Sequence, residues 1–435
     1  MTPLVWKNLS PSRRTAALER PAQTRSTEIA SAVSRIIMEV ARDGDAALKR
    51  LTAKFDGAKL TSLRVSAAEF AAAEKALAPA DQTALRTAYR NIRRFHAAQA
   101  AKPIRVETMR GITCEKVTRP IERVGLYVPG GSAPLFSTAL MLGVPAQLAG
   151  CPTRILCTPP GRDGRVNPWI LFAAQLCGIT DVFKVGGAQA IAAMATSTKT
   201  IPKCDKLFGP GNAFVTEAKL QVSRSAAGAA IDMPAGPSEV MVIADASAEP
   251  AFVAADLLSQ AEHGPDSQVV FVTFSAKFAA RVAAEVTTQL RLLPRREIAE
   301  AALEKSRAII AASPAEAVAI ANRYAPEHLI LQLANPRRLL PQITAAGSVF
   351  VGPWTPESLG DYASGTNHVL PTYGWARSFS GLGLADFSRT MTVQEATPLG
   401  FARLGRTVAR LADAESLVAH RRAVTVRLQK LSRST

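Results

Sequence analysis

The spacing of hydrophobic residues changes near residue 124. Before it, apolar residues recur every three or four positions, which predicts helices. One helix is expected to begin at a Ser26 cap and run to about Phe55, and a long one follows Pro79. The apolar face of the long helix carries Leu85, Tyr89, Ile92 and Phe95. The first hundred residues are therefore predicted to be helical.

From about residue 124, short apolar runs alternate with helical segments in two series. The first series has predicted strands at 154–158 and 181–185 and helices beginning at Pro168 and after Asn212. The second has predicted strands at 239–244, 268–274, 328–333 and 348–351, and helices over 250–262, from 277 and after Ser313. Such alternation is typical of parallel sheets with helices on both faces. After about residue 383 the chain is predicted to be helical again, with a last helix over 412–431.

The length and composition indicate a folded chain of more than one domain. The 435 residues exceed what one hydrophobic core organises, and 48% are hydrophobic and 20% charged. No run of about 18 apolar residues occurs, so no membrane-spanning helix is expected. The first twenty residues lack the apolar core of a secretory signal. We therefore expect a cytoplasmic protein that does not insert into membranes.

The net charge of +17 raises the alternative of a basic RNA-binding protein. Its arginines gather in the helix around Arg86–Arg94 and in the C-terminal tail. Between Arg224 and Lys277, however, there is no Lys or Arg, and seven carboxylates lie in this stretch. A basic exterior around an acidic, metal-ready centre favours an enzyme with no nucleic-acid partner.

Five cysteines form no CxxC pair and are odd in number: Cys114, Cys151, Cys157, Cys177 and Cys204. We interpret them as reduced and mostly buried. Cys151 and Cys157 lie beside or within a predicted strand. A second alternative, an aldehyde dehydrogenase, would use one of these two thiols as its nucleophile.

Three glycine-rich turns each follow a predicted strand and precede a predicted helix, at 128–132, 185–189 and 209–212. Free backbone N–H groups at a helix start bind phosphate, so three such turns indicate a dinucleotide. Tight turns between strands and helices also need glycine. The glycines alone leave both interpretations open.

Four of the five histidines lie near other polar groups. Gln260 and His263 share a helix face at i, i+3, and Glu327 directly precedes His328 at a strand start. The other groupings are Asp361 with His368 in one loop, and Glu415 with His420 near the C-terminus. Carboxylate, amide oxygen and imidazole together suit Zn²⁺ or Mn²⁺. Each histidine could instead be an ordinary hydrogen-bonded residue.

Seven segments together resemble the histidinol dehydrogenase family. They lie at 123–138, 185–193, 208–219, 232–240, 259–269, 324–330 and 360–372. The resemblance runs from about residue 20 to the C-terminus. It implies the last step of histidine biosynthesis, in which L-histidinol becomes L-histidine through L-histidinal. It also implies two NAD⁺ and one Zn²⁺ per site, in a homodimer.

The resemblance assigns roles residue by residue. The implied metal ligands are Gln260, His263, Asp361 and His420, and the implied proton-transfer pair is Glu327 and His328. Implied substrate contacts, besides His328 and the metal ligands, are Ser238, His368 and Glu415, and implied NAD⁺ contacts are Tyr127, Gln189 and Asn212. One departure is the loop at 161–168, which is longer than usual in the family.

The resemblance also implies the architecture, an α/β fold of two incomplete Rossmann-like parallel-sheet domains, one inserted in the other. The expected parts are an N-terminal helical arm (1–23), a main domain (24–126 and 238–382), an inserted nucleotide-binding domain (127–237) and a helical C-terminal domain (383–435). The last part is expected to reach the partner subunit, so that the active sites are shared.

The expected mechanism uses Zn²⁺ for position and charge, because it has no redox chemistry. His328, neutral at pH 7, is expected to accept protons in both oxidation steps, and Glu327 to activate water for the second. Adjacent residues of a strand point to opposite faces. The two side chains can therefore share a site only if this strand begins irregularly.

Overall fold

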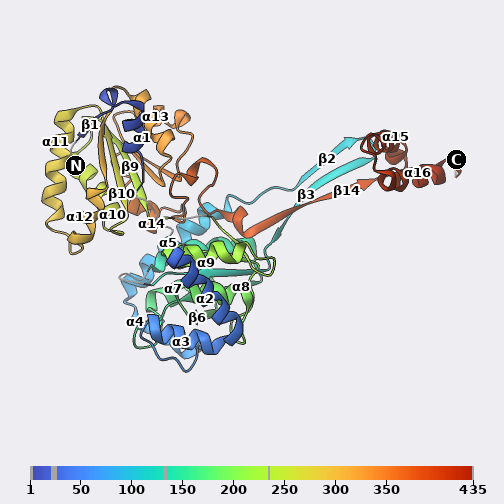
Figure 1. Ribbon diagram of the computed structural model, residues 1–435, viewed down its shortest axis with the longest axis horizontal. Helices are drawn as coiled ribbons and strands as arrows, with labels where there is room; N and C mark the ends of the chain where they lie inside the picture. The colour runs from blue at the N-terminus through green and yellow to red at the C-terminus, as the bar shows by residue number, and fades with distance from the viewer. Residues whose placement is uncertain (1–2, 21–26, 131–134, 234–235, 434–435) are drawn as a thin grey trace. The chain divides into compact units, whose positions relative to one another are not determined.

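The computed structural model describes residues 3–20, 27–130, 135–233 and 236–433 (Figure 1). These fall into two compact units. One comprises residues 1–99 and 121–387, and the other comprises residues 100–120 and 388–435. The first unit contains two parallel sheets, each covered by helices on both faces, which confirms the predicted α/β class.

The first sheet has the strand order β1-β11-β10-β9-β12-β13, and every neighbouring pair is parallel. Its strands are β1 (Pro3–Val5), β9 (Glu239–Ala244), β10 (Gln268–Thr273), β11 (Arg307–Ile310), β12 (His328–Gln332) and β13 (Ser348–Val351). Apart from β1, the order by sequence is 3-2-1-4-5, that of an incomplete Rossmann sheet. We call this sheet with its helices the six-stranded lobe.

Alternate residues of β9 contribute to two different cores. Val240 and Val242 pack with α10 (Pro250–Ala261), α11 (Ala276–Leu290) and α12 (Arg296–Glu304). Met241 and Ile243 pack on the other face with α13 (Pro314–Tyr324) and the N-terminal segment. That segment continues from β1 through a 3₁₀ turn (Trp6–Asn8) and α1 (Pro11–Ala17). The strands are buried on both faces, as in other parallel sheets.

The second sheet has the order β6-β5-β4-β7-β8, again 3-2-1-4-5 and again parallel throughout. Its strands are β4 (Arg123–Tyr127), β5 (Thr153–Thr158), β6 (Asp181–Lys184), β7 (Lys206–Phe208) and β8 (Ala230–Ile231). One face is covered by α4 (Ala67–Ala76), α5 (Pro79–Ala97), α6 (Phe136–Ala149) and α7 (Pro168–Leu176). The other is covered by α2 (Thr27–Asp43), α3 (Asp45–Phe55), α8 (Gly187–Thr196) and α9 (Ala213–Ser223). We call this the five-stranded lobe.

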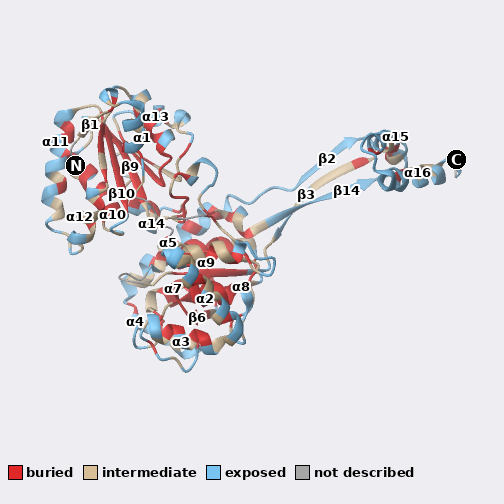
Figure 2. Cartoon of the chain, in the orientation of Figure 1, coloured by how far each residue is buried: buried red, intermediate tan, exposed pale blue. Residues whose placement is uncertain are grey.

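The second unit is an antiparallel sheet with two helices. Its elements are β2 (Ile104–Met109), β3 (Ile112–Pro120), β14 (Ser388–Ala396), α15 (Pro398–Ala414) and α16 (Val418–Arg433). Figure 2 shows the contrast in burial: the strands of the parallel sheets are red, whereas this unit is mostly pale blue. β2 is exposed at all six positions.

Several predicted elements are confirmed, including the strands at 239–244 and 348–351 and the helix from Pro168. The single helix to Phe55 is wrong, because Gly44 has a positive φ of 54° and separates α2 from α3. Its expected cap, Ser26, lies outside the described residues. The purely helical segment after 383 is also wrong, since β14 forms there. β2, β3 and β14 were missed because exposed strands lack the apolar runs of buried ones.

The domain boundaries stay a prediction, but the helices near the N-terminus pack on a different sheet from the one expected. Residues 24–126 were expected to belong with the six-stranded lobe. The helices between 27 and 97 instead share their cores with the five-stranded sheet, and β1 places residues 3–5 in the six-stranded sheet. An amphipathic pattern shows that a helix has an apolar face, but not which sheet it covers. No helix of the described residues is long and apolar enough to cross a bilayer.

Candidate active site

Polar side chains converge at the amino ends of β9 and β12, two neighbouring strands of the six-stranded lobe. Glu239 begins β9 and His328 begins β12. Gln260 lies in the last turn of α10 and His263 follows that helix, which returns from the carboxyl end of the sheet. Glu357 and Asp361 lie one turn apart on α14 (Glu357–Tyr362). Asp361 is thus on a helix and not, as expected, in a loop.

Four of these residues form a cluster of nitrogen and oxygen donors. One ligand atom each from His263, Glu357 and Asp361 lies within 4.8 Å of the others. The Gln260 amide lies 3.2 and 3.3 Å from the two Glu357 carboxylate oxygens, and it donates to them when its nitrogen faces them. Turned the other way, its carbonyl oxygen joins the carboxylates as a ligand. This donor set fits Zn²⁺ or Mn²⁺.

The electrostatics of the cluster also favour a cation. Burial raises the pKa values of Glu327 and Glu357 well above their usual range and that of Asp361 to about 7. The negative charges of Asp361, Glu327 and Asp256 raise the pKa of Glu357 further. A divalent cation would stabilise the ionised carboxylates and remove this penalty. The residues present therefore fit a metal ion.

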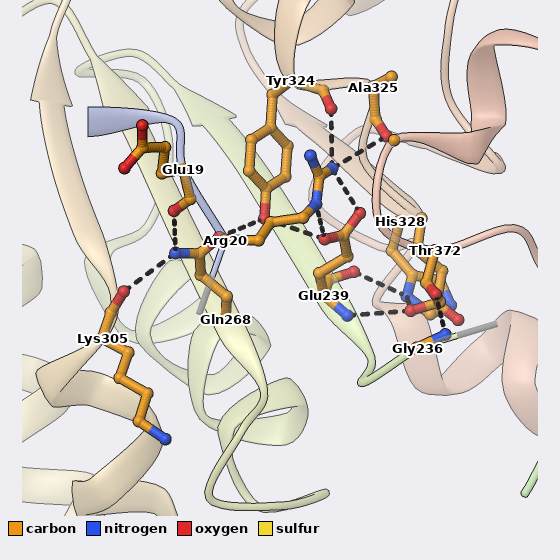
Figure 3. A network of polar contacts seen from close by, with 12 residues as sticks. Glu19, Arg20, Gly236, Glu239, Gln268, Lys305, Tyr324, Ala325, His328 and Thr372 are labelled. Atoms are coloured by element: carbon orange, nitrogen blue, oxygen red, sulfur yellow. Dashed lines mark hydrogen bonds and ion pairs between the residues drawn. The ribbon is translucent and has the colours of Figure 1, made fainter. Parts of the chain in front are cut away.

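His328 is buried and held at one ring nitrogen. Its Nδ1 lies 3.2 Å from the carbonyl oxygen of Glu239 (Figure 3). The same nitrogen lies 3.2 Å from Oε1 of Gln260. Its Nε2 has no hydrogen-bond partner among the described residues and lies 3.7 Å from Oδ1 of Asp361. Burial lowers the pKa of His328 to about 3, so the ring is neutral at pH 7. With Nδ1–H donating to the Glu239 carbonyl, the lone pair on Nε2 is free to accept a proton.

The Glu327 side chain lies beside that of His328, although adjacent residues of a regular strand point to opposite faces. Its Oε2 accepts a hydrogen bond from the backbone N–H of Glu239 at 2.9 Å and lies 3.7 Å from Nδ1 of His328. Glu327 precedes β12, and Ala325, two residues before Glu327, has a left-handed φ of 53°. The strand therefore begins irregularly, as the shared site requires.

The glycine-rich turns lie at the carboxyl ends of β4, β6 and β7, in the five-stranded lobe. The Tyr127 hydroxyl accepts a hydrogen bond from the backbone N–H of Gly187 at 3.0 Å. The backbone N–H of Gly209 donates to Asp232, and Lys219 donates to the Gly209 carbonyl while pairing with Asp232. Side chains thus hold these turns in place. Part of the first turn, residues 131 and 132, lies outside the described residues.

The other predicted site residues are placed as follows. Asn212 caps α9 by accepting from two backbone N–H groups, and Gln189 is buried on α8. Ser238 directly precedes β9. Nδ1 of His368 lies 2.9 Å from the Asp361 carbonyl oxygen, and Nε2 lies 3.2 Å from Oγ1 of Thr138. His420 on α16 and Glu415 at the end of α15 are exposed residues of the second unit.

Glu357 is the member of the cluster that the sequence analysis missed. The polar groupings in the sequence centre on histidines, and no histidine lies near Glu357 in the sequence. Its spacing of four from Asp361 was the available signal, since it places two carboxylates on one helix face. That signal becomes visible only once α14 is recognised as a helix.

The cysteines lie away from this chemistry. All five thiols are free, and four are buried, as predicted. Burial raises the pKa of Cys151 to about 11 and that of Cys157 well above its usual range. Neither forms a thiolate at neutral pH, which removes the basis for a cysteine nucleophile.

The comparisons with known proteins agree with the predicted resemblance. The family model for histidinol dehydrogenase matches residues 18–428. The chain belongs to the histidinol dehydrogenase family. It is 58% identical to the histidinol dehydrogenase of Vibrio cholerae over 434 residues, with 100% coverage of each chain. It is 55% identical to that of Salmonella typhimurium over 426 residues, which cover 98% of this chain and 97% of that one. The crystal structure of histidinol dehydrogenase from Elizabethkingia anophelis superposes with a TM-score of 0.94 at 48% identity, covering 98% of both chains. The chain is therefore an oxidoreductase, as the resemblance predicted.

Proposed function

We propose that the chain oxidises L-histidinol to L-histidine through L-histidinal, the last step of histidine biosynthesis, with two NAD⁺ and one Zn²⁺ per site. Family membership supports the reaction. The observation that carries the mechanism is the buried His328, whose Nδ1 is held by a carbonyl while Nε2 has no partner among the described residues. This is the arrangement of a neutral general base.

Gln260, His263 and Asp361 are the proposed metal ligands of the lobe, and Glu357 lies within reach of the same position. When bound, Zn²⁺ supplies positive charge that orients the polar groups of the substrate. His368 contacts the Asp361 carbonyl and Ser238 directly precedes Glu239, and both are proposed to contact the substrate with the ligands themselves. Together these residues hold the alcohol carbon near His328.

His328 acts in both oxidation steps. In the first, Nε2 accepts the hydroxyl proton of the alcohol while the carbon loses a hydride, which gives the aldehyde. Water then adds to the aldehyde: Nε2 returns its proton to the aldehyde oxygen as Glu327 takes one from the water. The hydrate loses a second hydride while Nε2 accepts a hydroxyl proton, which gives the carboxylic acid. NAD⁺ supplies the hydride acceptor in each step.

Glu327 is proposed to take the proton of the attacking water. Burial raises its pKa, so the ionised form, which a bound cation would stabilise, accepts a proton more readily than an exposed carboxylate does. Its bond from the Glu239 N–H fixes one oxygen and leaves the other available. Glu327 thus contributes to the second oxidation only.

The nucleotide is proposed to bind at the carboxyl ends of β4, β6 and β7, with contacts from Tyr127, Gln189 and Asn212. In a sheet of order 3-2-1-4-5, the strand order reverses between the neighbouring strands β4 and β7. Ligands of open α/β sheets bind in the crevice outside that point. The glycines there let the backbone approach a pyrophosphate closely.

The test is the formation of NADH from L-histidinol, with and without a chelator. We expect two NADH for each L-histidinol, complete loss of turnover with chelator, and recovery with Zn²⁺ or Mn²⁺. One NADH per substrate would contradict the two-step oxidation. Full activity in a verified metal-free preparation would contradict the metal site.

We also propose a homodimer in which His420 and Glu415 of one chain complete the active site of the other. The second unit exposes apolar side chains along both its sheet and its helices, including Ile104, Val106, Met391, Leu411 and Val418. Clustered apolar exposure of this kind marks a protein interface. In a two-fold dimer the exchange would be symmetric, so both sites would be hybrid.

Co-expression of an Asp361→Ala chain with a His420→Ala chain tests the sharing. In a mixed dimer with shared sites, one site carries both changes and the other carries none. Random pairing makes half of the dimers mixed, so about a quarter of all sites should be intact. Activity at the level of either single variant would show that His420 acts within its own chain.

A further inference from the structure

A buried ion pair lies on the face of the six-stranded sheet opposite His328. Arg20, just after α1, makes two parallel hydrogen bonds to Glu239, from Nε to Oε2 at 2.5 Å and from Nη2 to Oε1 at 2.8 Å. The side chains are only 13% and 2% exposed. The Arg20 guanidinium also stacks 4.0 Å above the ring of Tyr324. Buried pairs are often no more stabilising than an apolar replacement, so this one calls for a reason besides stability.

Glu239 connects the two faces of the sheet. Its side chain points toward Met241 and Ile243, into the core that contains Tyr324, and there it holds Arg20. Its backbone N–H donates to Glu327, and its carbonyl oxygen lies 3.2 Å from Nδ1 of His328. Figure 3 shows Glu239 between Arg20 and His328. One peptide segment thus orients both proposed proton-transfer groups.

Arg20 also holds the chain that leads into β12. Its Nη2 donates to the carbonyl oxygen of Tyr324 at 2.7 Å and lies 3.4 Å from that of Ala325. The Tyr324 hydroxyl lies 3.1 Å from Oε2 of Glu239 and 2.7 Å from Oε1 of Gln268. The left-handed Ala325 that turns Glu327 toward the site is therefore held on its N-terminal side by the same guanidinium that holds Glu239.

We propose that Arg20 and Tyr324 are positioning residues that act through Glu239 on the catalytic pair. By fixing the Glu239 backbone, they keep the proton of His328 on Nδ1 and hold Glu327 beside the ring. A 1 Å misplacement of catalytic groups is enough to slow a reaction about a hundredfold, so a modest loosening of this segment lowers the rate. The inference rests on the roles proposed above for Glu327 and His328.

The first test compares Arg20→Lys and Tyr324→Phe with Arg14→Lys. Lysine keeps the charge of Arg20 but cannot make its two parallel hydrogen bonds to Glu239, and phenylalanine removes only the hydroxyl of Tyr324. Arg14 is the matched control, because it lies in the same segment and stacks on Trp6 without contacting Glu239. We expect kcat for L-histidinol to fall about tenfold in Arg20→Lys, and less in Tyr324→Phe, with KM changed less than about twofold. Arg14→Lys should keep both constants.

The second test separates positioning from a general loss of structure. For the first oxidation, each change is combined with His328→Asn. If Arg20 acts through His328, the tenfold effect of Arg20→Lys should shrink to less than about twofold in that background. A full tenfold loss in both backgrounds would overturn the proposal, as would wild-type kcat in Arg20→Lys. If Arg20→Lys does not fold, the same double-mutant cycle with His328→Asn is measured for Tyr324→Phe.

The two proposals fail in different ways. The unmodified chain could form NADH from L-histidinol while the effects of Arg20→Lys and His328→Asn are additive. The proposed function would then stand, and the positioning role would be wrong. If the unmodified chain forms no NADH, both fall together.

Discussion

Apart from β1, the two lobes have the same strand order, but they place their polar groups at opposite ends of the corresponding strand pair, β4 with β7 in one and β9 with β12 in the other. In the five-stranded lobe, the glycine turns follow the carboxyl ends of β4 and β7 and present backbone groups. In the six-stranded lobe, side chains gather where β9 and β12 begin, together with the ends of α10 and α14. One end of this topology suits binding by the main chain. The other end suits side-chain chemistry, because returning helices and starting strands meet there.

This comparison predicts that changes in the two regions affect different measurements. Changes at the amino ends of β9 and β12 should alter rates and leave NAD⁺ affinity intact. Changes at the carboxyl ends of β4 and β7 should do the reverse.

The largest effect is expected for His328→Asn, which removes the proton acceptor of both steps. Oxidation of L-histidinol and of L-histidinal should each fall by about 10²–10⁴-fold, the usual contribution of a general base. The Kd of NAD⁺, measured by fluorescence titration, should stay within about twofold of the unmodified chain. A matching loss of NAD⁺ affinity would show that the two regions are not separable.

Lys219→Met should have the largest effect in the five-stranded lobe. It leaves the buried Asp232 carboxylate unpaired beside Gly209, and unpaired buried charges cost about 3 kcal/mol or more of unfolding free energy. Urea unfolding and NAD⁺ titration should both show the change. Lys305→Met is the control, because its pair with Asp266 is exposed and should contribute less than about 1 kcal/mol. Equal losses in the two variants would contradict the role of the buried pair.

Glu327→Gln should slow the two oxidation steps to different extents. We expect L-histidinal oxidation to slow about tenfold more than L-histidinol oxidation, because only the second step consumes water. The two substrates are assayed separately, with His328→Asn as the variant that slows both. Equal slowing of both steps by Glu327→Gln would remove its assigned role.

Asp256→Asn should have the smallest effect, on the pH dependence of stability. Burial raises the pKa of Asp256 to about 7. Between pH 4 and 7 the unfolded chain therefore holds fewer protons than the folded one, and this carboxyl lowers the unfolding free energy as pH rises. In Asp256→Asn the loss between pH 6 and 7 should be smaller by about 1 kcal/mol. Urea unfolding at both pH values measures it, with the exposed Asp266→Asn as a control that keeps the original slope.

The sequence predicted most of what lies in the two parallel sheets. Their strands are buried on both faces, so they appear as short apolar runs between turns, as at 239–244. The exposed strands of the second unit have no such runs, and β14 was missed for that reason. Helix α14 is only six residues long, too short for its periodicity to show, so Glu357 was missed with it.

The sequence pattern predicted less of the candidate site than of the fold. Glycine turns are local motifs, and all three were found from the residues alone. The side-chain cluster draws on α10, β12 and α14, which only tertiary packing brings together. Its members could be assigned roles only through the family resemblance. Arg20 was missed altogether, because nothing near it in the sequence indicates a partner 219 residues away.

That separation has a consequence for how the chain assembles. One core of the five-stranded lobe is complete by residue 229, whereas β1 must wait for β11, whose residues 308–310 it pairs with. During synthesis the first twenty residues therefore remain without their sheet partner until about three-quarters of the chain has been made. Closing so long a loop is slow, so the proton-transfer pair matures late in folding. An affinity tag or truncation at the N-terminus would thus act directly on the maturation of the active site.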